Sequence, residues 1–352
     1  MTESQLLLAF HHDTDEAGIE AWTRHFAAAG THAVVLQMGS YAVLVADATA
    51  EHAMPAHLPS PRATVRTGGG VRLARRELVP GGTLVTIGPT VIGDGGIAVF
   101  AGPCAVETED QLLTSAMAVA HHGAVGLRGG AFKPRTSPYA FHGLGWAGLD
   151  LLARARAATG LPIVTEVVDP RHVARVAETA DSLQIGARNM QNFPLLTEVG
   201  RAGLPVVLKR GFGATLDELL SASEYLLVEG NDQVVLCERG IRTFEPITRF
   251  TLDLSAVALL KQRTHLPVMV DPSHSSGMPE LVEPLSLAAV AAGADALLID
   301  VHGQPELAVC DGSQAILPDR FGQLMERLSS MAIGLGRPMA SLARATALSE
   351  FA

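Results

Sequence analysis

The sequence predicts an eight-stranded β/α barrel, a TIM barrel of the α/β class, preceded by a small α+β unit. From residue 97 onward, a short apolar run followed by a helix-prone stretch recurs eight times over about 230 residues, which is the arithmetic of a (β/α)8 barrel. An open doubly wound sheet is the alternative, but it predicts fewer units and a glycine-rich nucleotide loop, and the sequence has neither. The apolar runs are 97–101, 124–127, 162–164, 182–185, 205–208, 234–237, 267–270 and 296–299.

The first 75 residues carry the pattern of a ferredoxin-like β-α-β-β-α-β unit. Strand-like runs occur at 6–10, 33–38, 41–46 and 63–65, and Gly39-Ser40 between the middle two is typical of a hairpin. Asp13 with Glu16 indicates the start of the first helix. Ile19, Trp22 and Phe26 follow at helical spacing, whereas Pro55 interrupts the second helix. We therefore expect a small domain over 1–75, a linker and β-rich lead-in over 76–96, and the barrel over 97–352.

Composition excludes several classes of protein. The 352 residues are 48% hydrophobic and carry a net charge of −10, which argues against a nucleic-acid partner. No apolar run reaches about 18 residues, so we expect no membrane span. The acidic first thirty residues do not resemble a signal peptide, and three cysteines do not make a disulfide framework. The chain is therefore expected in the cytoplasm with reduced thiols.

Basic residues gather where the predicted strands end. Because the carboxyl ends of barrel strands meet at one mouth, these cations would share a pocket and would repel one another unless anions sat among them. Arginine and lysine are the natural ligands of phosphate and carboxylate, so their number suggests two phosphorylated substrates. Only three of the 26 basic residues are lysine, which singles out Lys133, Lys209 and Lys261 as candidates for sites that need a compact ammonium. The strand-end cations are Arg128, Lys133, Arg135, Arg188, Lys209, Arg210, Arg239 and Arg242.

A second set at the strand ends could hold a metal. A thiol, imidazoles and carboxylates form a mixed set suited to a divalent first-row ion, although the spacing alone is not diagnostic. Cys104 could equally be a small buried hydrophobe and His274 a helix cap. Cys237 and Cys310 are interpreted as structural, and Glu166, Asp271 and Glu238 could orient cations or move protons. The metal candidates are Cys104, His274, Asp300, His302 and Asp311.

Six ordered motifs resemble one family. The segments 102–107 (GPCAVE), 127–138 (LRGGAFKPRTSP), 184–189 (QIGARN), 208–211 (LKRG), 237–245 (CERGIRTFE) and 270–275 (VDPSHS) are similar to the 3-deoxy-D-arabino-heptulosonate 7-phosphate (DAHP) synthases, type Iβ, whose members include chains with an N-terminal ferredoxin-like domain. The resemblance implies an aldol-type condensation of phosphoenolpyruvate with erythrose 4-phosphate that releases phosphate. This reaction is the first step of the shikimate pathway toward aromatic amino acids.

The resemblance also implies roles for individual residues. Lys133, placed between the two substrates, is our candidate for proton delivery, with Cys104 and His274 completing the catalytic set. Phosphoenolpyruvate would be held by Arg128, Lys133, Arg188, Lys209 and Arg239 beside the Ala187 backbone, and erythrose 4-phosphate by Arg135, Thr136 and Ser137. A divalent ion (Mn²⁺, Co²⁺, Fe²⁺ or Zn²⁺) would be held by Cys104, His274, Asp300 and Asp311.

One implied ligand departs from the family pattern. The family usually has Glu where this chain has Asp300, which is shorter by one methylene, roughly 1.5 Å of reach. Metal–oxygen distances tolerate only a few tenths of an ångström, so Asp300 puts the affinity for the metal in question.

The family also suggests partners and alternatives. Related N-terminal domains bind tyrosine or phenylalanine and close over the barrel mouth, so we expect feedback regulation and a homo-oligomer, a dimer or a tetramer. One alternative is a synthase for 3-deoxy-manno-octulosonate 8-phosphate, which uses arabinose 5-phosphate. Those relatives typically have Lys-Ala-Asn-Arg where this chain has Lys-Pro-Arg-Thr-Ser at 133–137, which disfavours that substrate. Another is a low-activity regulatory paralogue that partners chorismate mutase, supported only by Asp300.

Overall fold

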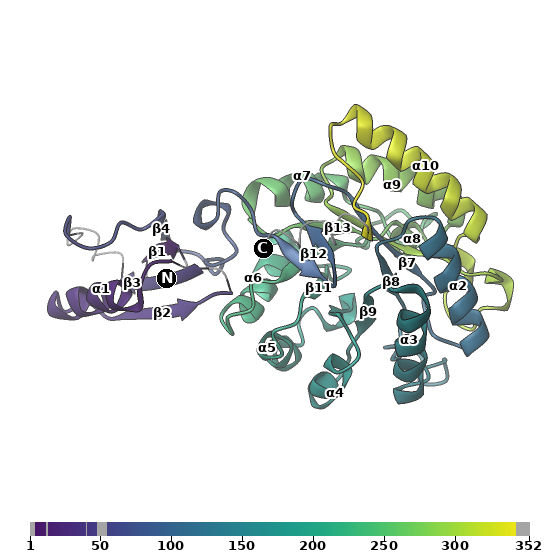
Figure 1. Cartoon of the computed structure of the whole chain (residues 1–352), viewed down its shortest axis with the longest axis horizontal. Coiled ribbons are helices and arrows are strands. Elements are labelled where there is room, and N and C mark those ends of the chain that lie inside the picture. Colours follow the sequence, from purple (N-terminus) through teal and green to yellow (C-terminus); the bar gives the residue numbers. More distant parts are fainter. Residues whose placement is uncertain (1–3, 12, 40, 48–54, 343–352) are drawn as a thin grey trace.

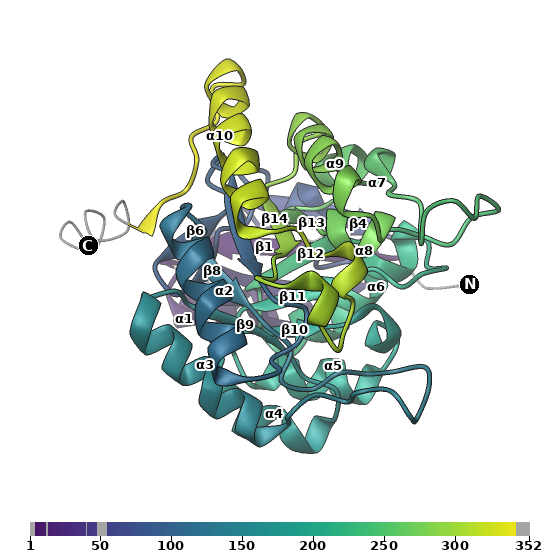
Figure 2. The same cartoon turned by 90° about the vertical axis from the view of Figure 1, so that its right-hand side faces the viewer.

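The computed structural model describes residues 4–11, 13–39, 41–47 and 55–342, and its main body is a closed parallel barrel. The ring closes where the last strand pairs with the first, with Asp300 opposite Gly102. This confirms the predicted barrel, and in Figure 2 the strands form a ring inside a shell of helices. The barrel strands are β7 (Ala98–Gly102), β8 (Gly126–Arg128), β9 (Ile163–Glu166), β10 (Ser182–Ile185), β11 (Val206–Lys209), β12 (Val234–Glu238), β13 (Val268–Val270) and β14 (Ala296–Asp300).

Each barrel strand is followed by helical structure that returns the chain to the opposite end of the barrel. Side-chain caps fix several helix starts: Thr215 and Glu218 form a capping box at the start of α6, and Asp271 caps α8 by accepting from the His274 N–H. The helices are α2 (Glu109–His121), α3 (Trp146–Thr159), α4 (Val173–Ala177), α5 (Phe193–Arg201), α6 (Leu216–Leu227), α7 (Leu254–Arg263), α8 (Pro272–Ser276), α9 (Pro279–Ala291) and α10 (Pro318–Gly334). None of the helices within the described residues is both long and apolar enough to cross a membrane.

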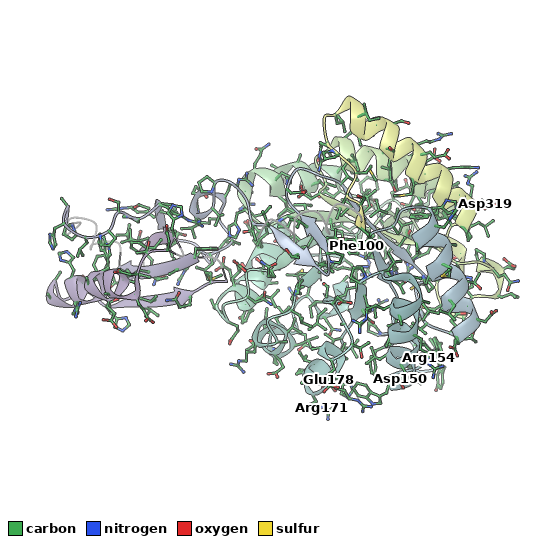
Figure 3. The ribbon with its side chains drawn as sticks, in the orientation of Figure 1. Phe100, Asp150, Arg154, Arg171, Glu178 and Asp319 are labelled. Carbon is green, nitrogen blue, oxygen red and sulfur yellow. The ribbon has the colours of Figure 1, made fainter. Side chains whose placement is uncertain are left out.

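The barrel interior is apolar toward the amino ends of its strands. Phe100, labelled in Figure 3, packs there with Val164, Val207 and Met269, all of them fully or almost fully buried. Burying one such side chain stabilises the fold by about 1.5–3 kcal/mol. A short hairpin from the predicted lead-in, β5 (Val85–Ile87) and β6 (Thr90–Ile92), packs against this cluster. Because this end is filled with side chains, the opposite mouth is where a pocket can form.

The amino-terminal unit is a four-stranded antiparallel sheet with a helix on one face, as the ferredoxin-like pattern predicts. Its elements are β1 (Gln5–His11), α1 (Glu16–Ala28), β2 (Ala33–Gln37), β3 (Tyr41–Asp47) and β4 (Ala63–Thr67). Trp22 and Phe26 of α1 pack on the sheet, but the predicted helix start at Asp13 is wrong. Asp15 caps the helix instead, because its extended backbone directly precedes the first turn and its carboxylate accepts from the Gly18 N–H at 2.8 Å.

Two predicted helices lie partly or wholly outside the described residues. The second helix of the ferredoxin-like pattern falls largely on 48–54. The tail after Pro338, for which the sequence predicts a terminal helix, falls largely on 343–352. The predicted linker lies within the described residues and contains a 3-10 helix, η2 (Arg76–Leu78), whose Leu78 is fully buried in the core.

The sheet contacts the barrel at the amino ends of its strands (Figure 1). The Tyr41 ring meets the His265 ring at 6.4 Å, just before β13, and the Glu224 carboxylate accepts hydrogen bonds from the backbone N–H groups of 72–74. His265 itself bridges the Leu73 carbonyl and the Thr83 hydroxyl. Within the single chain the sheet therefore lies at the end opposite the mouth and does not cover it, contrary to the closure that the family resemblance led us to expect.

Candidate active site

The carboxyl ends of the barrel strands bring the predicted site residues to one mouth. A cavity of about 290 Å³ opens there, with Glu166, Gln184 and Phe212 among its lining residues. Cys104 and Asp300 lie against it, in contact with Lys133 and Arg128 respectively. The predicted residues that line the cavity are Arg128, Lys133, Arg135, Thr136, Ser137, Ala187, Arg188, Lys209, Arg239, His274 and Asp311.

Two of the strand-end cations do not belong to this cavity. The guanidinium of Arg210 forms ion pairs with Glu238 at 2.9 Å and Asp253 at 3.1 Å, so it is neutralised within the protein. Arg242 is exposed and does not line the cavity. The third lysine, Lys261, pairs with Asp295 on the barrel exterior. A position at the end of a strand is therefore not enough to predict that a basic residue lines the cavity.

The Arg239 guanidinium is buried beside two aromatic rings and has a hydrogen-bond donor available for an anion. Its guanidinium lies 4.4 Å from the centre of the Phe250 ring and 4.9 Å from that of Phe212, and these two rings are stacked. Its Nη1 atom is buried without a hydrogen-bond partner among the described residues. Burial is the main reason that the pKa of Arg239 is lowered to about 10. A buried cation with an unused donor is an electrostatic cost that a bound phosphate or carboxylate would remove.

Lys133 reaches the thiol of the metal candidates. Its Nζ atom lies 3.0 Å from the Cys104 carbonyl oxygen and 3.1 Å from the Cys104 sulfur. Burial disfavours the ammonium, but Cys104 and then Glu166 outweigh it, so the pKa of Lys133 is raised. Gly130 makes room for this side chain, because a Cβ there would lie 2.6 Å from Lys133 Cδ. Lys133 is thus a protonated acid held at the wall of the cavity.

Lys209 and Asp271 form the second buried charge pair of the mouth. Lys209 Nζ donates to Asp271 Oδ2 at 2.5 Å, and both side chains are buried. Burial disfavours the Asp271 carboxylate, but the charges of His274 and then Lys209 outweigh it and hold its pKa well below the usual range. The same Oδ2 atom lies 2.9 Å from His274 Nδ1. The Asp271 carboxylate therefore lies against the Nδ1 side of the imidazole, and Nε2 lies toward the Cys104 thiol.

Two side chains, Cys104 and Asp311, bring donor atoms close to that nitrogen. His274 Nε2 lies 3.6 Å from Cys104 Sγ and 3.8 Å from Asp311 Oδ2, and Cys104 Sγ lies 3.2 Å from that oxygen. Two groups of three, Cys104–His274–Asp300 and Cys104–Cys310–Asp311, bring their ligand atoms within 4.8 Å of one another. A thiol, an imidazole and a carboxylate this close, with the imidazole held by a second carboxylate, fit a divalent cation.

Without an ion, the electrostatics of the cluster keep its thiol and its imidazole protonated. The hydrogen bond to Cys310 and then burial raise the pKa of the Cys104 thiol. Burial disfavours the His274 imidazolium, but the Asp271 and Asp300 carboxylates outweigh it and raise its pKa. A divalent ion reverses this balance, because it displaces the protons from a thiol and an imidazole that it binds.

The side chain of His302 contacts residues outside the cluster. Its Nε2 atom lies 3.7 Å from a carboxylate oxygen of Glu107, and the Gln304 N–H donates to its Nδ1 atom. Neither group of candidate ligands among the described residues includes it. Within the described residues, the polar side-chain contacts of His302 are with Glu107 and Gln304 and not with the cluster, so its place among the metal candidates stays a prediction.

Several residues of the site escaped the sequence analysis. Arg249 lines the cavity, pairs with Asp311 at 3.3 Å and donates to Gln314 at 2.7 Å. Phe212 lines the cavity beside Arg239. Cys310, interpreted as structural, lies 3.8 Å from Cys104. Arg249 and Cys310 lie in long loops beyond the strand ends, where no repeat marks a functional position.

Comparisons with known proteins agree with the fold and the site. The family model described as the DAHP synthetase I family matches residues 82–333. A Thermotoga maritima protein named phospho-2-dehydro-3-deoxyheptonate aldolase is 47% identical over 265 residues, which cover 75% of this chain and 78% of the relative. A Syntrophotalea carbinolica protein named 2-dehydro-3-deoxyphosphooctonate aldolase is 32% identical over 270 residues, 71% of this chain and 95% of the relative.

Solved structures extend the likeness to the amino-terminal unit. The crystal structure of the Thermotoga maritima phospho-2-dehydro-3-deoxyheptonate aldolase (DAHP synthase) superposes with a TM-score of 0.76 at 38% identity, covering 96% of this chain and 99% of the other. A truncated form of the Thermotoga 3-deoxy-D-arabino-heptulosonate 7-phosphate synthase gives a TM-score of 0.72 at 43% identity and covers 77% of this chain and all of the other.

The barrel, its cationic cavity and the adjoining thiol–imidazole–carboxylate cluster define an enzyme class: metal-assisted enzymes that act on small phosphorylated substrates. The family match and the identity to the Thermotoga relative make the assignment specific. The chain belongs to the DAHP synthetase I family.

Proposed function

We propose that this enzyme condenses phosphoenolpyruvate with erythrose 4-phosphate to give DAHP and inorganic phosphate, the first step of the shikimate pathway. The observation that carries the proposal is the cavity itself: buried cations surround it, and a cluster of metal-ligand side chains adjoins it. The 47% identity to the Thermotoga heptonate aldolase supports the same reaction.

The positions of the cations suggest how the two anions are held. Arg128, Lys209 and Arg239 lie at the ends of β8, β11 and β12, and we assign them, with Lys133 and Arg188, to phosphoenolpyruvate. The loop after β8 contributes the erythrose 4-phosphate residues Arg135, Thr136 and Ser137. Arg188 Nη2 donates to Thr136 Oγ1 at 3.2 Å, so the two subsites share a boundary. Holding two repelling anions side by side is the main obstacle that this cavity removes.

The proposed chemistry follows from this arrangement. Carbon 3 of phosphoenolpyruvate attacks the aldehyde carbon, and Lys133 gives a proton to the aldehyde oxygen. Water adds to the cationic carbon 2, and the carbon–oxygen bond to the phosphate then breaks, releasing inorganic phosphate. A divalent ion bound at the cluster would supply Lewis acidity toward the aldehyde oxygen. Cys104, His274 and Asp311 would hold that ion, with Asp300 as the fourth ligand expected from the family.

The choice of aldose is not given by family membership, because relatives named for heptonate and octonate products both match. The identity to the heptonate aldolase is 47%, against 32% for the octonate one. The segment Lys-Pro-Arg-Thr-Ser at 133–137 also differs from the Lys-Ala-Asn-Arg expected of the arabinose 5-phosphate enzymes. Both observations favour erythrose 4-phosphate.

We further propose that the amino-terminal unit, residues 1–75, is a regulatory domain that responds to tyrosine or phenylalanine. Because it lies away from the mouth of its own barrel, we propose that it acts on the mouth of a second copy of the chain, in a dimer or tetramer. Chorismate mutase is a further candidate partner. Because phosphorylated sugars do not cross membranes freely, we also propose that the reaction takes place in the cytoplasm.

Phosphate release tests the reaction and the metal together. The full-length enzyme, treated with a chelator and then given Mn²⁺, Co²⁺, Fe²⁺ or Zn²⁺, should release phosphate from phosphoenolpyruvate only when both an ion and erythrose 4-phosphate are present. Release that resists chelation would contradict the metal assignment. Binding of phosphoenolpyruvate without turnover under every condition would favour the regulatory paralogue.

A further inference from the structure

Cys310 lies among the donor atoms of the proposed metal site. Its sulfur is 3.8 Å from the Cys104 sulfur and 3.7 Å from Asp311 Oδ2. Tetrahedral bonds of about 2.3 Å to sulfur and about 2.0 Å to nitrogen place two sulfurs about 3.8 Å apart and sulfur and nitrogen about 3.5 Å apart. The Cys104–Cys310 distance matches the first value, and the 3.6 Å between Cys104 Sγ and His274 Nε2 matches the second.

Asp300 belongs to the group that includes Cys104 and His274, but both of its oxygens already contact other side chains. Its Oδ1 atom is 3.0 Å from an Arg128 nitrogen, and its Oδ2 atom accepts from the Gln314 side-chain amide at 2.6 Å. The nearest His274 atom to Asp300 is Nδ1, at 3.4 Å, which is the nitrogen that Asp271 already contacts. A histidine offers its other nitrogen, Nε2, to a metal in this orientation. Asp300 therefore approaches the imidazole at Nδ1, whereas Cys104 and Asp311 approach it at Nε2.

The surroundings can support two thiolates. Arg135 Nη1 donates to the Cys310 sulfur at 2.6 Å, and Lys133 Nζ lies 3.1 Å from the Cys104 sulfur. Each sulfur thus has its own cation, so a second negative charge at the cluster is compensated. Both cysteines are buried, which protects such a site from solvent.

We propose that Cys310 is the fourth metal ligand of this chain, in place of Asp300. The set is then Cys104, Cys310, His274 Nε2 and Asp311, two sulfurs with one nitrogen and one oxygen. Thiolates favour thiophilic ions such as Zn²⁺ and carboxylates favour Mn²⁺, so this site prefers Zn²⁺. The inference rests on the metal-binding part of the proposed function and is independent of the aldose.

Cobalt absorption counts the thiolates without any turnover. We would titrate the full-length, reduced, metal-stripped protein with Co²⁺ under anaerobic conditions and record the near-ultraviolet thiolate-to-cobalt charge-transfer band. Since each thiolate contributes to that band, Cys310→Ser should lower its intensity to about half, and Asp300→Asn should leave it unchanged. Cys237→Ala, which alters a buried cysteine of the barrel core, is the matched control and should also leave it unchanged.

One result would overturn the assignment: an undiminished band in Cys310→Ser. X-ray absorption of the zinc-loaded wild-type protein gives an answer even if a variant fails to fold, because the proposal requires two sulfur neighbours and one sulfur contradicts it. A protein that shows two thiolates but no condensation would refute the proposed function alone. Condensation with a single thiolate would refute only this inference.

Discussion

The Asp300 carboxylate lies 3.0 Å from the Arg128 guanidinium, and both side chains are almost completely buried. Arg128 also donates to the Pro103 carbonyl at 2.7 Å. Asp300, where this chain departs from the family pattern, is therefore paired with Arg128, which we assign to phosphoenolpyruvate. The effect of Asp300 should appear in anion binding and in stability.

Asp300→Asn should destabilise the ligand-free enzyme. The substitution leaves the buried Arg128 charge without its partner, which costs about 3–5 kcal/mol of the free energy of unfolding. Phosphoenolpyruvate should restore part of that loss by supplying a new anion. Denaturant unfolding with and without phosphoenolpyruvate measures both effects, and equal stability of wild type and variant without ligand would show that the pair contributes nothing.

Lys133→Met should reduce kcat by about 100-fold or more while changing the Michaelis constants little, because a positioned general acid acts mainly in the transition state. Lys261→Met is the matched control, since that lysine pairs with Asp295 outside the cavity and should leave turnover unchanged. Metal content must be measured in both variants because Lys133 contacts Cys104. Near-normal turnover with raised Michaelis constants would assign Lys133 to binding alone.

Arg239→Gln should weaken phosphoenolpyruvate binding without destabilising the protein. A charge-assisted hydrogen bond contributes about 1.5–3 kcal/mol, so its loss corresponds to roughly 10- to 100-fold in affinity. Stability should hold or rise because the wild-type guanidinium is buried with an unused donor, and burial lowers its pKa to about 10. Calorimetric titration and thermal unfolding test the two parts, with the exposed Arg242→Gln as control. Unchanged affinity would remove Arg239 from the site.

His265 should make the stability of the chain pH-dependent. Burial lowers its pKa from 6.5 to about 4, so the unfolded chain binds a proton more readily than the folded one. The stability contributed by the neutral ring is present above pH 6.5 and is lost as the pH falls toward 4. At pH 5 the loss amounts to about 2 kcal/mol.

Denaturant unfolding at pH 7 and pH 5 checks this prediction. The wild-type protein should lose about 2 kcal/mol more unfolding free energy between pH 7 and pH 5 than the His265→Gln variant does. Glutamine is chosen because its side chain can still hydrogen-bond Leu73 and Thr83. His121 is exposed, so the control variant His121→Gln should show the same pH dependence of stability as the wild type. An unchanged pH dependence in the His265 variant would mean that the ring is not buried neutral at the contact between the sheet and the barrel.

The barrel could be predicted because each strand leaves a local mark, an apolar run that ends at a polar residue. Closure of the ring then brings Cys104 and Asp300 together although about 200 residues separate them. The lysine argument also held in part, since Lys133 and Lys209 line the cavity while Lys261 lies outside. These inferences use only local pattern and the symmetry of the fold.

What the sequence could not give depends on loops and on side-chain direction. Arg249 and Cys310 reach the site from loops whose paths have no periodic signature. Arg210 carries the same strand-end mark as Lys209, yet it turns toward Glu238 and Asp253. Which way a side chain points at the end of a strand is decided by the neighbouring charges in the folded chain.

The central claim is the identity of the reaction, and product analysis with competing aldoses tests it most directly. The metal-loaded enzyme would receive phosphoenolpyruvate with equal amounts of erythrose 4-phosphate and arabinose 5-phosphate, and the products would be identified by mass. We expect the seven-carbon DAHP, with one phosphate released for each molecule formed. An eight-carbon product as the main species, or consumption of phosphoenolpyruvate without a new carbon–carbon bond, would contradict the account.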